Sequence, residues 1–329
     1  MAGKISVIVA SNRPDELDKF MDAWWTNSKF TESVGEMYVV FDGQTAPESL
    51  IEGKHSHRPI TVADWDMIGR RLPVADCKVI SRRDAAIKSY GVLMMKDAGD
   101  SNTAVFLDDD VRPLPNTDLT KHCLPIPRWD SLLDDVRLRG LPYINDGKTE
   151  VVMNVGMWTN VPDLDAATQL VTPAGDYRLP TNTRVLAKGM YAPMCGMNLG
   201  FQSKAAPLAY MAPMGEGRLY RRFDDIWMGV VAKKVCDRLG WLIGYGPPHV
   251  EHIRASDPFN NLVREAPGVG ANEHFWETID SLDLTETTPA GCLAELAEEM
   301  RSVPPPNRMQ PEYWTDLADC YTIWSKFFQ

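Results

Sequence analysis

Three consecutive aspartates, Asp108, Asp109 and Asp110, are the side chains of this sequence best suited to chemistry. They directly follow the apolar run 103–107, which has the length and the β-branched and aromatic content of a buried strand. Carboxylates crowded at one strand end destabilise a fold unless a cation or hydrogen-bond donors neutralise them. Such oxygen ligands favour Mg²⁺ or Mn²⁺, which often also hold substrate phosphates. The cluster therefore predicts a divalent ion that bridges the protein to a diphosphate, with a solvated acidic turn as the alternative.

The elements that must position these carboxylates alternate between strands and helices. Alternation of this kind predicts an α/β fold with a doubly wound, mostly parallel sheet flanked by helices. In such sheets ligands bind beyond the carboxyl ends of the strands. We predict strands at 5–10, 37–41, 77–80 and 103–107, and helices at about 14–27 and 82–97, the second with Ser81 as its cap.

Four polar clusters fall at the carboxyl ends of the predicted strands, which is stronger evidence for a site than any one of them alone. The arginines are donors for phosphate, and the aspartate at the second strand end is an acceptor for a base or a ribose. The predicted nucleotide-binding residues are Ser11, Asn12, Arg13, Asp42, Arg82, Arg83 and Asp108.

The second half of the chain is less regular. Its segment 193–200 contains two glycines and little charge, which favours tight backbone near a ligand. We expect one domain over 1–329, with a nucleotide-binding half (1–115), a sugar or acceptor half (116–280) and a C-terminal helical extension (281–329). Further strands are predicted at 151–158 and 241–245, and helices up to about 239, at 290–300 and at 311–328.

Composition narrows the function classes. The 329 residues are 44% hydrophobic and carry a net charge of −11, which argues against a broad nucleic-acid or anionic-membrane surface. No run approaches the roughly 18 apolar residues of a membrane span, and residues 1–4 lack the features of a signal peptide. None of the six cysteines forms a CxxC pair, so structural zinc is not expected. We expect a reduced, cytoplasmic protein without a membrane span.

Several long segments resemble the plant reversibly glycosylated polypeptides, a family that includes the UDP-arabinopyranose mutases. The resemblance implies a GT-A-like fold, a UDP-sugar as substrate, and Mn²⁺ or Mg²⁺ as cofactor. It extends from about residue 5 to residue 325. The segments that carry it are 64–66, 106–110, 156–170, 193–199, 223–227, 236–240 and 252–262.

The resemblance also implies metal ligands. Asp110 is the implied direct ligand, and Asp108 is implied as a second ligand or as a contact to the ribose. His252 matches a family histidine after a strand and is implied to complete the metal site, with His249 as the weaker alternative.

Catalytic roles are implied for three carboxylates. Asp224 and Asp225 resemble an acidic acceptor-site motif, in which a carboxylate handles a sugar hydroxyl; the alternative is an acidic first turn that stabilises a helix dipole. The sequence departs from the family where an arginine accepts sugar reversibly, because Asp146 stands at that position. Asp146 could act as a nucleophile or base, although an ordinary Asn-Asp-Gly turn is the preferred interpretation.

These observations favour a UDP-sugar pyranose–furanose mutase. The absent arginine favours the alternative, a true glycosyltransferase that passes the sugar to a glycan, a small molecule or a hydroxymethylated DNA base. The acidic net charge makes DNA the weaker acceptor. A non-catalytic subunit that binds nucleotide sugar is disfavoured, because the carboxylate motifs and the histidine are all retained. Association into a homo-oligomer stays open.

Overall fold

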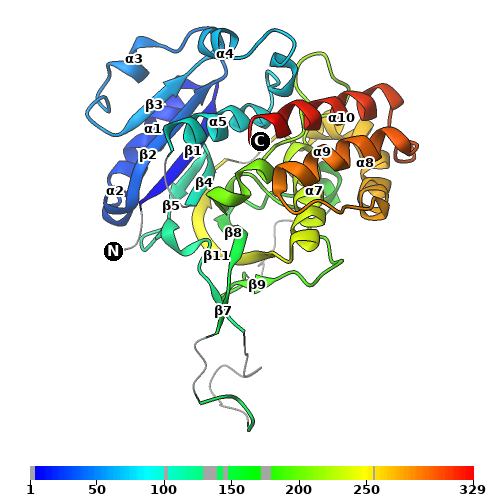
Figure 1. The fold of residues 1–329 in the computed structure, drawn as a ribbon. Helices are drawn as coiled ribbons and strands as arrows, with labels where there is room; N and C mark the ends of the chain where they lie inside the picture. The colour runs from blue at the N-terminus through cyan, green and yellow to red at the C-terminus, as the bar shows by residue number, and fades with distance from the viewer. Residues whose placement is uncertain (1–3, 100–102, 129–138, 144–146, 172–178, 255) are drawn as a thin grey trace.

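The computed structural model describes residues 4–99, 103–128, 139–143, 147–171, 179–254 and 256–329. A nine-stranded sheet crosses the described part of the chain and has helices on both faces (Figure 1). Eight strands follow the order β3-β2-β1-β4-β10-β8-β11-β5, and β9 pairs with β11.

The first part of the sheet is parallel and comes from the N-terminal third of the chain. Its strands are β1 (Ile5–Ser11), β2 (Val34–Phe41), β3 (Ile60–Ala63) and β4 (Thr103–Asp108). Strand alternation sends successive side chains to opposite faces. Val7 and Val9 therefore pack with Leu17 of α1 (Pro14–Trp25), whereas Ile8 packs on the side of α5 (Lys88–Ala98).

The second part of the sheet mixes strand directions. β10 (Asn198–Gln202) runs antiparallel to both β4 and β8 (Val151–Asn160), and β8 is parallel to β11 (Leu242–His252). The short strands β5 (Val111–Pro113) and β9 (Arg184–Val185) are antiparallel to β11. β6 (Ile126–Pro127) and β7 (Lys148–Thr149) form a separate two-stranded sheet.

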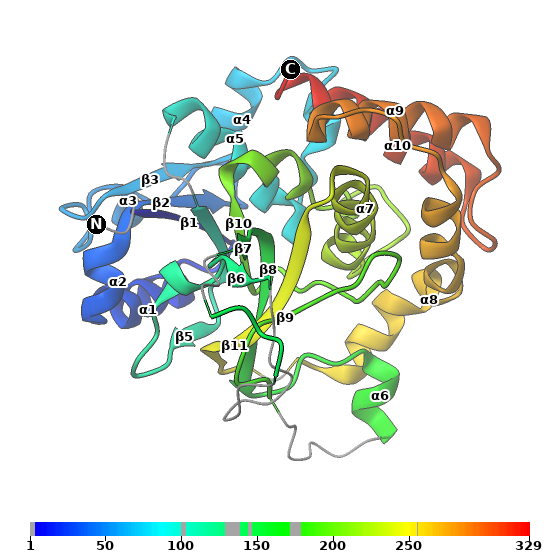
Figure 2. The same ribbon diagram turned by 60° about the horizontal axis from the view of Figure 1, so that its bottom comes forward.

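Long helices complete the fold: α7 (Asp224–Leu239), α8 (Pro258–Ser281), α9 (Pro289–Ser302) and α10 (Pro311–Lys326). The last three each begin at a proline, which suits a first helical turn, and lie together beside α7 (Figures 1 and 2). Shorter helices are α2 (Ser28–Ser33), α3 (Glu48–Ile51), α4 (Trp65–Arg71) and α6 (Ala166–Val171), with 3₁₀ turns at Cys77–Val79, Ala85–Ile87, Leu119–Lys121 and Ser203–Leu208.

The predicted α/β class is confirmed, with its mostly parallel sheet, flanking helices and helical C-terminal extension. The predicted strand 77–80 is wrong: Cys77–Val79 is a 3₁₀ turn, and β3 is the strand that pairs with β2. Val79 and Ile80 are buried, and a short apolar run does not distinguish a strand from a buried turn. Ser81 is not a helix cap, because its hydroxyl donates to Asp84 and the α-helix begins at Lys88. The division of the chain at 115 and 280 stays a prediction.

Candidate active site

The triple aspartate lies where β4 leaves the sheet, and its middle carboxylate is neutralised by the loop after β1. Asp109 is 4% exposed and accepts hydrogen bonds from the Ser11 hydroxyl and from the Arg13 guanidinium, whose Nε lies 3.2 Å away. Nη2 of Arg13 also lies 3.2 Å from Asp110. Nη1 of Arg13 is buried and has no hydrogen-bond partner among the described residues. The arginine thus neutralises two carboxylates and keeps one donor unused.

The sheet brings Asp110 to His252. β5 follows the aspartates directly and pairs with the end of β11, where Val111 is the partner of His252. Nε2 of His252 lies 3.9 Å from Oδ1 of Asp110, and Nδ1 of His252 lies 2.9 Å from the Val161 carbonyl oxygen. Burial, followed by the neighbouring aspartates, raises the pKa of Asp110. The carboxylate is therefore in a position where a cation would stabilise its charged form.

Asp108 is paired with a buried lysine. Nζ of Lys88, at the start of α5, donates to Asp108 and to the Gly196 carbonyl oxygen, the latter at 3.0 Å. Lys88 is 2% exposed. Burial by itself lowers the pKa of this ammonium, but the neighbouring acidic groups, Asp108 first among them, raise the pKa overall. Lys88 therefore remains charged and holds Asp108 at the edge of the site.

A second group of carboxylates lies where α7 begins. Asp224 accepts from the backbone N–H of Ala85 at 3.1 Å, and Asp225 accepts from the backbone N–H of Gly196 at 2.9 Å. Burial, with Asp84 as the next cause, raises the pKa of Asp224 to about 7. Burial and the adjacent Asp224 raise the pKa of Asp225 to about 8. Acids of this strength exchange protons near neutral pH.

The end of β2 carries an aromatic and cationic cluster. Asp42 accepts from the indole N–H of Trp65 at 2.7 Å and from the backbone N–H of Arg83 at 2.6 Å. The Arg82 guanidinium lies over the Trp65 ring, 4.8 Å from its centroid. Arg83 adopts a positive φ of 60°, which is uncommon for a residue with a side chain. This corner of the site offers a flat ring, a carboxylate and cationic groups.

The structure therefore brings most of the predicted residues to one edge of the sheet. Asn12 lies exposed in the same loop as Arg13. His249 is buried instead against the ring of His122, with ring centroids 4.6 Å apart. Asp146 lies outside the described residues. The functional roles of all these residues stay predictions.

Sequence reasoning missed Lys88, Trp65 and Gly196 as parts of the site. Trp65 and Gly196 lie in segments 64–66 and 193–199, which carry the family resemblance, but the sequence of those segments indicates no role for either residue. The available signal for Lys88 was a lone charge in the largely apolar stretch 85–95. A lysine among buried neighbours needs a charged partner, so this position could have been singled out for its burial.

The side chains present fit a divalent ion between Asp110 and His252. With Nδ1 of His252 donating to a carbonyl oxygen, Nε2 keeps its lone pair and faces the carboxylate. The 3.9 Å between the two atoms is short enough for both to reach one ion after a small movement of either side chain. In the described part of the chain no group of three His, Cys, Asp or Glu side chains forms a metal site. Two protein ligands leave the remaining positions to phosphate oxygens and water, as is usual for Mg²⁺.

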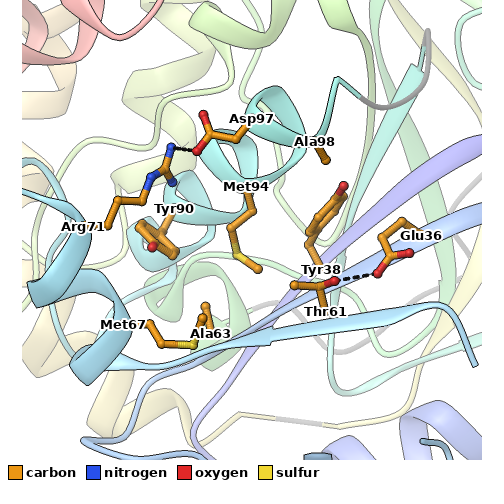
Figure 3. Close-up of a pocket in the computed structure, with 10 residues that line it drawn as sticks. All are labelled: Glu36, Tyr38, Thr61, Ala63, Met67, Arg71, Tyr90, Met94, Asp97 and Ala98. Carbon is orange, nitrogen blue, oxygen red and sulfur yellow. Dashed lines mark hydrogen bonds and ion pairs between the residues drawn. The ribbon is translucent and has the colours of Figure 1, made fainter.

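A hollow of about 360 Å³ lies away from this site, between β2, β3, α4 and α5 (Figure 3). It is close to the start of β2 and the end of α5, whereas the predicted residues lie at the carboxyl ends of the strands. Its lining includes Glu36 hydrogen-bonded to Thr61, and Arg71 paired with Asp97 (Figure 3). None of the predicted site residues lines it.

The sheet order and the polar edge define the class as an α/β protein with a mostly parallel sheet and a polar cluster at the carboxyl ends of its strands. Comparison with known proteins gives the family. Residues 133–329 match the family model described as "Reversibly glycosylated polypeptide". The chain is 33% identical over 274 residues to UDP-arabinopyranose mutase 1 of Arabidopsis thaliana, covering 77% of this chain and 74% of the relative. It is 35% identical over 195 residues to probable UDP-arabinopyranose mutase 4 of the same plant, covering 57% and 52%.

This chain belongs to the reversibly glycosylated polypeptide family. It spans about half the length of the second relative and about three quarters of the first. Among solved structures, glucosyl-3-phosphoglycerate synthase from Mycobacterium tuberculosis is 16% identical with a TM-score of 0.44, covering 92% of this chain and 81% of that one. A TM-score this low says nothing about activity.

Proposed function

We propose that this protein is a metal-dependent enzyme that interconverts the pyranose and furanose forms of a UDP-sugar. Membership of a family whose relatives are named UDP-arabinopyranose mutases supports the reaction and makes UDP-arabinose the first substrate to test. The observation that carries the proposal is the approach of Asp110 to His252 at the same sheet edge as Asp225 and Arg13. In this arrangement the groups that would bind a diphosphate lie beside carboxyl groups that would handle protons.

The nucleotide half of the site would bind the UDP part. Asp42 and Trp65 offer an acceptor and a flat ring for the base and ribose, and Nη1 of Arg13 is a buried donor that the protein leaves unpaired. Buried donors without partners are costly unless a ligand satisfies them. Asp110 and His252 would hold Mn²⁺ or Mg²⁺, which when bound supplies positive charge to a departing diphosphate.

The sugar half of the site would handle the ring oxygens. A mutase must break the bond between the anomeric carbon and the ring oxygen and form a bond from that carbon to a different sugar hydroxyl. A proton must leave that hydroxyl, and another must reach the ring oxygen. If the diphosphate departs during this exchange, its bond to the anomeric carbon must form again. Asp225, with its pKa raised to about 8, is partly exposed and can both give and accept a proton near neutral pH. Asp224 is buried and would mainly sustain the high pKa of its neighbour.

The decisive experiment incubates the protein with UDP-arabinopyranose and Mn²⁺ and separates the two ring forms by chromatography. The mutase predicts ring exchange with no net loss of UDP-sugar, and with no activity in excess EDTA. A protein that leaves the ring form unchanged but releases UDP when an acceptor is added would contradict the mutase and support a glycosyltransferase. Asp146, at the position of the family's sugar-accepting arginine, is the observation that favours this second candidate.

Because Asp146 stands in place of the arginine, we also expect that this chain does not label itself stably with sugar. A glycosyl ester on Asp146 would be labile to base, so no stable adduct is expected there. Intact mass spectrometry after incubation with donor and Mn²⁺ should show the unmodified mass. A stable added pentose or hexose would restore the autoglycosylating reaction.

We also propose a cytoplasmic location. The six cysteines are free thiols, and none of the helices described is long and apolar enough to cross a membrane. A glycan, small-molecule or DNA-base acceptor belongs only to the glycosyltransferase alternative, and assembly into a homo-oligomer remains open to measurement by light scattering.

A further inference from the structure

Gly196 is held on both sides by charged groups from distant elements. Its carbonyl oxygen accepts from Nζ of Lys88 at 3.0 Å, and its N–H donates to Asp225 at 2.9 Å. Lys88 belongs to α5 and Asp225 to α7, so the two contacts fix both peptide units that flank the glycine. The segment 193–199 is thereby tied to the nucleotide half and to the sugar half at once.

The Lys88 ammonium is buried and paired with one carboxylate. Lys88 is 2% exposed, its ammonium is paired with Asp108, and it lies 6.0 Å from the centroid of the Phe106 ring. A buried ammonium is costly unless it is paired and hydrogen-bonded. Replacing both members of a buried ion pair by apolar side chains is often neutral for stability, so stability alone does not explain why a lysine stands here.

Gly196 lies close to the Asp225 side chain. A Cβ added to it would lie 2.3 Å from the terminal methyl of Met211 and 3.7 Å from the Asp225 carboxylate. The backbone at this point is therefore in close contact with the group that we propose to handle sugar protons. A small shift of Gly196 would move the hydrogen-bond donor of Asp225 and with it the carboxylate.

We infer that Lys88 is a positioning residue that holds Gly196, and through it Asp225, in register with Asp108 at the end of β4. The expected effect on turnover rests on the proposed function. The connection runs through four groups in order: the Asp108 carboxylate, the Lys88 ammonium, the Gly196 backbone and the Asp225 carboxylate. Reactions that need both the diphosphate end and the sugar end of the site would depend on it.

The test compares Lys88→Met with Lys233→Met. Lys233 is also 2% exposed and ion-paired, but its partner is Asp237 within α7, which makes it a matched control for loss of a buried lysine. Three quantities are measured with folded protein: kcat and KM for ring exchange, the Kd of UDP in Mn²⁺, and amide hydrogen exchange of 193–199.

Lys88→Met should lower kcat at least tenfold, raise the Kd of UDP by a clearly smaller factor than kcat falls, and speed exchange in 193–199 at least tenfold. Lys233→Met should change none of these three. An unchanged kcat in Lys88→Met would overturn the inference. So would a loss of UDP affinity as large as the loss of kcat, because Lys88 would then act on the nucleotide rather than on the sugar half.

Two further outcomes are distinguishable. If the wild-type protein turns over no UDP-sugar, the proposed function fails, and hydrogen exchange alone decides: faster exchange of 193–199 in Lys88→Met than in Lys233→Met sustains the positioning role, and equal exchange rejects it. If Lys88→Met does not fold, Lys88→Met is combined with Asp108→Asn, so that no Asp108 carboxylate is left without its lysine partner. Faster exchange than in Asp108→Asn alone supports the inference there, and equal exchange rejects it.

Discussion

Arg13→Met is the substitution that most directly tests how the triple aspartate is neutralised. The Arg13 side chain is 29% exposed, and that of its partner Asp109 is 5% exposed. Removing one partner of a buried pair costs about 3–5 kcal/mol, and the partial exposure of Arg13 places the expected loss at about 3 kcal/mol. Unfolding entropy of about 2.1 cal/mol/K per residue over 329 residues gives about 0.7 kcal/mol/K, so Tm should fall by roughly 4 °C.

Arg71→Met is the matched control for this prediction. The Arg71 side chain is also 29% exposed, but its partner Asp97 is 52% exposed. Exposed ion pairs contribute about 0–1 kcal/mol, so its Tm should fall by roughly 1 °C. The assay is differential scanning calorimetry without metal, repeated with saturating Mn²⁺. The ion should restore Arg13→Met more than Arg71→Met, because it takes over the neutralising charge. Equal losses in the two variants, or equal restoration, would refute the reasoning.

Three further predictions concern the pH response, the metal and the packing. Burial raises the pKa of Asp225 to about 8, above its usual value near 4, so the folded state binds an extra proton and stability is lost as pH rises through about 8. Denaturant titrations between pH 5 and 9 should therefore show a flatter dependence of stability on pH in Asp225→Asn than in the wild type. Parallel profiles of the two proteins would contradict this. Asp110→Asn should abolish the Mn²⁺-dependent part of the stabilisation by UDP, about 2.7 kcal/mol at a hundredfold excess over Kd, and a preserved thermal shift would exclude the residue as a ligand. Gly200→Ala should lower the free energy of unfolding by about 1–3 kcal/mol in urea denaturation, because its Cβ would lie 2.4 Å from the Cβ of His122. Gly69→Ala in α4 is the control: its Cβ would meet nothing within 4 Å, so the change should be neutral or slightly stabilising.

Much of the first half of the fold could be predicted from the sequence, because its signals are local. The run 103–107 is apolar and β-branched, and the structure gives β4 as Thr103–Asp108. Pro14 begins α1, and the C-terminal helices begin at prolines that fix the first turn. The strand prediction for 77–80 is wrong because an apolar run indicates burial, whereas strand pairing decides whether a buried segment is a strand.

The amino-acid sequence by itself determined which groups are available for chemistry: it has carboxylates after strands, arginines that we predict to bind phosphate, and relatives named as UDP-arabinopyranose mutases. Only the tertiary structure decided which of these groups meet. The pairing of β5 with β11 brings His252 to Asp110, and the burial of Lys88 joins Asp108 to Gly196. The physical reason is that side-chain type and periodicity act over a few residues, whereas a site depends on strand register and on charges buried by elements distant in sequence.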